Sequence, residues 1–239
     1  MLIARLIAET EECETRLDAL SAALSHGGVP HHPSAAVHDD LGVLELRFDQ
    51  GDPFAVLAAI DAAFFGADML VARDSIVVPR LFVSDMDSTM IGQECIDELA
   101  DYAGLKPQIA AITERAMQGE LDFESALRER VALLVGLAED AIHACLADRI
   151  TATPGASTLV ATLAGLGART VLVTGGFHHF ADPVAEMLGF HRVVGNRLGV
   201  EGGKLTGGLI GPITDSAVKA AVLRAELSGL SDGVHSLAT

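Results

Sequence analysis

The stretch Leu81-Phe82-Val83-Ser84-Asp85-Met86-Asp87-Ser88-Thr89 decides the fold. The run 81–84 is continuous and apolar, which is typical of a strand buried on both faces of a parallel sheet. Asp85 and Asp87 follow at once, so both carboxylates are expected at the carboxyl end of that strand, where open α/β sheets bind ligands. Two interpretations stay open, a helix N-cap with a turn or a nucleophile paired with an acid–base group.

A long helix-forming region follows, from residue 94 to about 150. Gly104, Gly119 and Gly136 divide it, and no strand pattern interrupts it. Strand and helix then alternate, which predicts a parallel sheet with helices on both faces, split after its first strand by a helical insertion. The Gly-rich segment 193–210 predicts a strand and hairpin at the sheet edge. The expected strands lie at 170–174 and 235–239, and the expected helices at 95–103, 107–118, 123–135, 139–149, 156–166 and 216–227.

The first eighty residues carry a separate pattern of short strands and helices. An apolar opening strand, a strand at 42–48 and a strand at 68–71 alternate with helices at 15–24 and 53–65. This pattern predicts a small α+β unit. A boundary near residue 79 would divide the chain into a domain of residues 1–79 and a second domain of residues 80–239.

Charge and composition limit the partners and the location. The chain has 16 Lys and Arg against 33 Asp and Glu, a formal charge of −17, which argues against nucleic acid or an anionic membrane as a partner. An anionic ligand must therefore be held by a few local cations or by a metal. The three cysteines form no CxxC pair, and no apolar run suits a signal peptide or a membrane span. We therefore expect a cytoplasmic protein.

Two further segments place polar groups at expected strand ends. Thr174-Gly175-Gly176-Phe177 follows the strand at 170–174, and a hydroxyl with two glycines lets backbone N–H groups approach an anion. Lys219 lies on the helix that Asp215 is expected to cap. Taken alone, the first segment is equally well a tight turn, and a single surface lysine is usually only solvated.

Taken together and in this order, these segments resemble the first three motifs of the haloacid-dehalogenase (HAD) superfamily of phosphotransferases. The stretch 112–123 and the residues 127–131 resemble the helical cap of the phosphoserine phosphatases in that superfamily. The similarity runs from about residue 80 to the end of the chain. The resemblance implies an α/β fold, a Rossmann-like HAD core with a parallel sheet and a helical cap at about 94–150.

The resemblance also implies roles for the polar residues. Asp85 would attack phosphorus and form an aspartyl phosphate, and Asp87 would serve as the acid and then the base. Mg²⁺ would bridge Asp85 and the phosphate, with the backbone carbonyl of Asp87 as a further ligand. Thr174, Gly175 and Lys219 would hold the phosphoryl oxygens.

Substrate choice, by the same resemblance, would come from Glu94 and the cap. Glu94 would bind the amino group of phosphoserine and Arg130 its carboxylate, with Met117 and Phe123 as apolar walls. Helical spacing independently makes the arginine unusual, because it shares one face with apolar residues. An arginine there either binds a ligand, reaches the surface, or pairs with a nearby carboxylate. The stripe consists of Phe123, Leu127, Arg130 and Leu134.

Two parts of the chain depart from the family pattern. The superfamily has a fourth, acidic motif that supplies another metal-binding carboxylate, and the sequence ends at Thr239, where that loop is expected to begin. We therefore expect a truncated chain that binds Mg²⁺ poorly and turns over slowly or not at all. The domain 1–79 faintly resembles an ACT-like regulatory module, which would bind an amino acid, mediate a homodimer or simply pack.

The leading hypothesis is Mg²⁺-dependent hydrolysis of O-phospho-L-serine to L-serine and phosphate, as in serine biosynthesis. A second hypothesis keeps the chemistry and replaces phosphoserine with another small phosphomonoester. A third is a non-catalytic amino-acid sensor. In the first two cases the partner is a small molecule.

Overall fold

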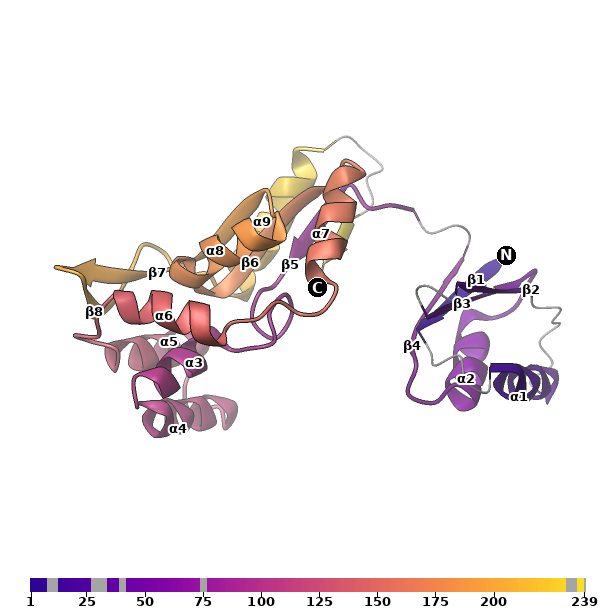
Figure 1. The fold of residues 1–239 in the computed structure, drawn as a ribbon, viewed down its shortest axis with the longest axis horizontal. Coiled ribbons are helices and arrows are strands. Elements are labelled where there is room, and N and C mark those ends of the chain that lie inside the picture. Colours follow the sequence, from indigo (N-terminus) through magenta and orange to yellow (C-terminus); the bar gives the residue numbers. More distant parts are fainter. Residues whose placement is uncertain (8–12, 27–33, 39–41, 74–76, 231–235, 239) are drawn as a thin grey trace. The chain divides into compact units, whose positions relative to one another are not determined.

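The computed structural model describes residues 1–7, 13–26, 34–38, 42–73, 77–230 and 236–238, with the backbone alone described for 34–38. The chain divides into two compact units, Met1–Val77 and Val78–Thr239, each of which is described by itself (Figure 1). Among the described residues, no helix combines the length and the apolar character that crossing a membrane requires.

The first unit is a four-stranded antiparallel sheet with the strand order β2-β3-β1-β4 and two helices. Leu2, Ala4 and Leu6 alternate along β1 and share a core with residues of both helices, including Leu20 and Ile60. The order βαββαβ is the ferredoxin-like arrangement. The ACT-like expectation goes beyond this topology and stays a prediction. The elements are β1 (Leu2–Ile7), α1 (Cys13–His26), β2 (Ser34–His38), β3 (Val43–Phe48), α2 (Pro53–Ala63) and β4 (Asp68–Arg73).

The second unit contains a five-stranded sheet with the order β8-β7-β6-β5-β9. Neighbouring strands pair in parallel except for the β7–β8 hairpin at the edge, which is antiparallel. The α/β fold with a mostly parallel sheet and an edge hairpin is confirmed. The strands are β5 (Leu81–Ser84), β6 (Arg169–Phe177), β7 (Arg192–Glu201), β8 (Lys204–Ile210) and β9 (Ser236–Ala238). Residues 235 and 239 of the expected last strand lie outside the described residues.

Helices cover both faces of this sheet because its central strands are apolar on both sides. Phe82 and Leu172 belong to a large core that includes residues of α7 (Ala156–Gly165) and α8 (His178–Leu188). The alternate positions, such as Val83 and Val171, join a smaller core with Val222 of α9 (Ser216–Ser228). The alternation of side chains along a strand places these two cores on opposite faces.

The segment between β5 and α7 is helical, as expected, and forms a group beside the sheet (Figure 1). Asp122 caps the third of its helices by accepting a hydrogen bond from Ser125 N at 2.7 Å. Backbone hydrogen bonds link this group of helices, the helical cap, to the edge hairpin β7–β8, with Gly136 N donating to Leu205 O at 2.8 Å. The helices are α3 (Cys95–Tyr102), α4 (Lys106–Met117), α5 (Phe123–Ala132) and α6 (Asp140–Arg149).

Candidate active site

The turn after β5 directs two carboxylates to the carboxyl end of the sheet. Ser88 adopts a φ of 51°, and the carbonyl of Met86 accepts a hydrogen bond from Met90 N at 2.9 Å, so the chain reverses immediately. Asp85 Oδ1 accepts a hydrogen bond from Met86 N at 2.8 Å. One oxygen of Asp85 is thereby fixed by its own backbone, and the other is left to face the cavity beyond the strand.

That second oxygen meets Lys219. Lys219 Nζ donates to Asp85 Oδ2, and the two side chains are 35% and 33% exposed. Asp215 caps α9 by accepting from Val218 N at 2.8 Å, as the sequence predicts, so the lysine lies in the first turn of a well-defined helix. The pair joins residues far apart in the chain and puts a cation beside the first carboxylate.

Asp87 lies in a drier environment. Its Oδ2 accepts from Cys95 N at 3.4 Å, and its Oδ1 is buried without a hydrogen-bond partner among the described residues. Burial raises the pKa of Asp87 to about 6 against the lowering effect of the Cys95 hydrogen bond, and the negative charge of Glu94 adds to the rise. A carboxyl group that changes its protonation near neutral pH suits proton transfer.

The glycine turn, residues 174–176, lies within the last part of β6, where the pairing with β7 shifts register, and side chains hold it on both sides. Thr174 Oγ1 accepts from Gly176 N at 2.9 Å, and Asn196 Nδ2 donates to the Gly175 carbonyl at 2.7 Å. A Cβ on Gly175 would approach Phe123 Cζ at 3.2 Å, so glycine permits the close contact between this turn and the cap.

Asn196 is a residue that the sequence analysis missed. It is 2% exposed, and its Oδ1 accepts from Thr214 N at 2.8 Å while its amide holds Gly175. It therefore connects the glycine turn to the segment that leads into α9. Its one signal in the sequence is an amide side chain within an otherwise apolar and Gly-rich strand region.

Two charged residues, Glu94 and Arg130, line the same cavity. Ser88 Oγ donates to Glu94 Oε1 at 2.8 Å. Arg130 Nε donates to the Ala126 carbonyl at 3.3 Å, and within the described part of the chain no carboxylate forms an ion pair with Arg130. Burial lowers the pKa of Arg130, and the charges of Asp97 and Glu94 oppose that effect.

One cavity of about 190 Å³ unites these groups. The core contributes the two aspartates and Lys219 to its lining, and the helical region contributes Arg130, with Glu94 just before α3. Eight of the nine site residues named from the sequence therefore line one space. The lining residues are Asp85, Asp87, Glu94, Ile96, Phe123, Leu127, Arg130, Thr174, Gly175, Gly176, Phe177 and Lys219.

Met117 is the expected site residue that the structure does not bring to this cavity. It is 84% exposed at the end of α4 and lines a different hollow with Lys106 and Ile109. Ile109 and Ile112 form the buried side of α4. Met117, the last residue of the helix, does not lie on that buried side. In the described structure, Ile96 and Leu127 are apolar walls of the cavity instead.

The family follows from the sequence comparison. Residues 82–235 match the family model of the haloacid dehalogenase-like hydrolases. The chain belongs to this family. The motif-based resemblance is thereby confirmed, and the region that matches includes both strand-end aspartates and Lys219.

Several relatives of this HAD chain are phosphoserine phosphatases. One from Albidiferax ferrireducens is 45% identical over 149 residues, which cover 60% of this chain and 63% of that protein. A solved phosphoserine phosphatase with an analogue of a phospho-aspartyl intermediate has a TM-score of 0.60 and 35% identity, covering 67% of this chain and 77% of that one. A probable phosphoserine phosphatase from Vibrio cholerae, in its unliganded form, has a TM-score of 0.78 and 28% identity, covering 99% of this chain and 71% of that one.

This HAD chain is similar to only part of the curated relatives that it matches. The shared region spans 63% of the protein from Albidiferax ferrireducens and 42% each of the phosphoserine phosphatases from Archaeoglobus fulgidus and Streptomyces coelicolor.

Proposed function

We propose that this protein hydrolyses O-phospho-L-serine to L-serine and phosphate with the help of Mg²⁺. The observation that carries the proposal is the shared cavity, which is lined by two aspartates and a lysine and also by Glu94 and Arg130. The first group suits a phosphoryl group and the second an amino acid. The phosphoserine phosphatases among the relatives support the same substrate.

The chain's residues would perform two displacements. Asp85 attacks phosphorus and forms an acyl phosphate while Asp87, protonated, gives its proton to the departing serine oxygen. Asp87 then takes a proton from water, whose oxygen attacks the phosphorus, releasing phosphate and restoring the Asp85 carboxylate. The pKa of about 6 supports this role, because Asp87 must carry a proton in one step and lack it in the next.

The groups beside Asp85 would hold the phosphoryl oxygens. Lys219 supplies a positive charge next to Asp85 Oδ2, and the Thr174 hydroxyl and the Gly175 backbone lie in the same cavity. These donors would be aligned before the substrate arrives, which lowers the cost of reorganisation as charge moves during transfer.

The donor set suits Mg²⁺. Asp85 and the backbone carbonyl of Asp87 are hard oxygen donors, and Mg²⁺ in phosphoryl-transfer sites commonly takes one or two carboxylates and keeps several waters. When bound, the ion neutralises charge on the phosphoryl group and polarises it.

A phosphate-release panel tests the proposal. With Mg²⁺ present, kcat/KM for phosphoserine should exceed that for p-nitrophenyl phosphate or a sugar phosphate by about 10- to 100-fold, because neither alternative pairs with both Glu94 and Arg130. Release should fall to the background rate in EDTA and return when Mg²⁺ is added. Equal rates for all three esters, or release that EDTA does not change, would contradict the proposal.

Replacing Arg130 with Ala should raise KM for phosphoserine about 10- to 100-fold, because the substrate carboxylate loses a charge-assisted hydrogen-bond donor. KM for p-nitrophenyl phosphate, which has no carboxylate, should change little. Arg128→Ala is the matched control on the same helix, since Arg128 pairs with Glu124 on the exposed side. Steady-state kinetics with both esters measure the two KM values. Equal increases of KM for the two esters would exclude a role of Arg130 in binding the substrate carboxylate.

A further inference from the structure

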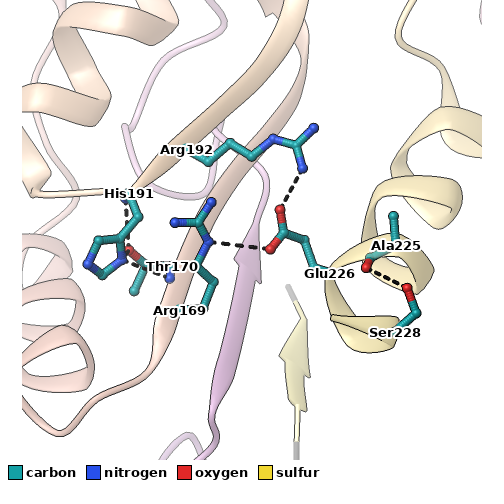
Figure 2. Close-up of polar contacts among 7 residues, drawn as sticks. All are labelled: Arg169, Thr170, His191, Arg192, Ala225, Glu226 and Ser228. Atoms are coloured by element: carbon teal, nitrogen blue, oxygen red, sulfur yellow. Dashed lines mark hydrogen bonds and ion pairs between the residues drawn. The ribbon is translucent and has the colours of Figure 1, made fainter. Parts of the chain in front are cut away.

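A cluster of charged residues lies at the amino ends of β6 and β7. The candidate active site lies at the carboxyl ends of the strands, so the two are at opposite ends of the sheet. Arg169 begins β6, and Arg192 begins β7. Figure 2 shows Glu226, near the end of α9, between these two arginines. None of the three lines the cavity described above, so the reaction itself does not explain the cluster.

Glu226 makes two ion pairs from a nearly buried position. Its Oε2 lies 3.3 Å from Arg169 Nε and its Oε1 2.5 Å from Arg192 Nη1. The Glu226 side chain is 12% exposed, whereas the arginines are 41% and 44% exposed. Burial alone would raise the pKa of Glu226, but the hydrogen bonds and charges of the two arginines outweigh it and lower that pKa, so Glu226 is ionised at neutral pH.

The two strands that present the arginines are fixed to each other at the same level. His191 Nδ1 accepts from Thr170 N at 3.1 Å, and the Thr170 hydroxyl lies 2.8 Å from the same nitrogen. The hydroxyl oxygen in turn accepts from His191 N at 3.1 Å (Figure 2). Because Thr170 directly follows Arg169 and His191 directly precedes Arg192, these bonds hold the starts of both strands, and with them both arginines, next to Glu226.

The position of Glu226 on α9 connects this cluster with Lys219. The two residues are seven positions apart, which is about two turns and about 10 Å along the helix, so they project from the same face. Val222 lies between them on that face and is the only buried residue of α9. Val218, Leu223 and Leu227 of α9 are partly buried and pack against the same small core, so apolar contacts hold the helix on the sheet, with an ion pair at each end of this face.

We propose that Glu226 is a positioning residue, whose pairs with Arg169 and Arg192 set the axial position of α9 and thereby hold Lys219 against Asp85. The apolar contacts of α9 are non-directional, so the directional polar contacts at the two ends of this face fix the position of the helix along the strands. The catalytic consequence rests on the proposed function, in which Lys219 holds the phosphoryl group. The geometric consequence, the placement of Lys219, does not.

The chain offers a direct way to observe Lys219. It contains three lysines, Lys106, Lys204 and Lys219, so acylation of each amine by an N-hydroxysuccinimide ester can be followed by peptide mass spectrometry. In the native protein the pair with Asp85 should slow the acylation of Lys219. Asp85→Asn, which removes the carboxylate, provides the upper limit of the rate.

Glu226→Gln should raise the acylation rate of Lys219 about two- to fivefold, toward that limit, since a weakened ion pair leaves the amine free more often. Lys106 and Lys204 should react at unchanged rates. Arg224→Gln, at an exposed position of the same helix, is the matched control and should leave all three rates unchanged. The double substitution Arg169→Gln and Arg192→Gln should reproduce the effect of Glu226→Gln.

Kinetics give the second readout. Glu226→Gln should lower kcat/KM for phosphoserine about two- to fivefold, and in a Lys219→Ala background the same substitution should have no further effect, because it acts through the lysine. A thermal shift without any change in Lys219 acylation would overturn the proposal and leave Glu226 a structural residue. If no ester is hydrolysed, the proposed function fails, while the acylation rates still decide the positioning role.

Discussion

Asp85→Asn should lower turnover of phosphoserine by at least about 10⁴-fold, the loss expected when a covalent nucleophile is removed. Asn retains the oxygen that accepts from Met86 N but has no carboxylate to attack phosphorus. The thermal midpoint should change little, because Asp85 and Lys219 are both about one-third exposed, at 33% and 35%. Rates of phosphate release and a thermal melt on the same preparation measure the two effects.

Asp148→Asn is the control for this substitution. Asp148 is an exposed residue of the cap helix α6 and does not line the cavity, so its variant should keep full activity. If Asp85→Asn retained more than about one-hundredth of the turnover, the carboxylate would be an aid to binding rather than the nucleophile.

Asp87→Asn should have two opposite effects, a loss of turnover of about 10²- to 10⁴-fold and a gain in stability of the metal-free protein. In the folded state the pKa of Asp87 is about 6, against 3.8 for the ordinary group. The unfolded chain therefore binds fewer protons between these values, and the contribution of Asp87 to stability falls as pH rises from about 4 to about 6. Asn has no carboxyl group to titrate, so the variant does not undergo this fall in stability with rising pH.

The stability gain depends on pH in a defined way. Above about pH 7 the free energy of unfolding should rise by about 2–3 kcal/mol, the difference between about 6 and 3.8 converted at about 1.36 kcal/mol per pH unit. Near pH 4 the gain should vanish. Urea denaturation in EDTA across this range measures it. A variant that is less stable than the parent at pH 7.5 would contradict the burial of an unsatisfied carboxylate.

Asp101→Asn should behave in the opposite way. The hydrogen bond from Arg149 lowers the pKa of Asp101, with the charge of Lys106 as the next contribution, so the ionised form stabilises the fold. The contribution is present at neutral pH and is lost as pH falls through the lowered pKa. Its Asn variant should therefore be slightly less stable at neutral pH and fully active, since Asp101 does not line the cavity.

The sheet and the cap could be predicted because their patterns are local. The apolar run 81–84 can be buried on both faces only in a central strand, and Asp215 precedes its helix as an N-cap. The helix α8 was not predicted as an element, because Pro183 lies inside it and a proline interrupts the usual helix signal. The strand Ser34–His38 was missed because two of its five residues are alanine, which is a poor strand former.

The candidate site was predictable where it lies at strand ends and less so where it depends on tertiary contacts. Asp85 could be placed at the site because it comes directly after a predicted strand. Lys219 could be placed there because it lies in the first turns of a helix that Asp215 caps. Asn196 could not be found in this way, because its function of holding the Gly175 carbonyl requires two strands to be adjacent. Met117 was expected at the cavity by resemblance alone, and the orientation of the last residue of α4 is set by how that helix packs.

The central claim is that the Asp85 carboxylate becomes phosphorylated. Brief incubation of the protein with phosphoserine and Mg²⁺, followed by reduction with tritiated borohydride, would convert an aspartyl phosphate into labelled homoserine that peptide sequencing can locate. The label is predicted at position 85 and should be absent from the Asp85→Asn variant. A label at Asp87 or at any other residue would contradict the account.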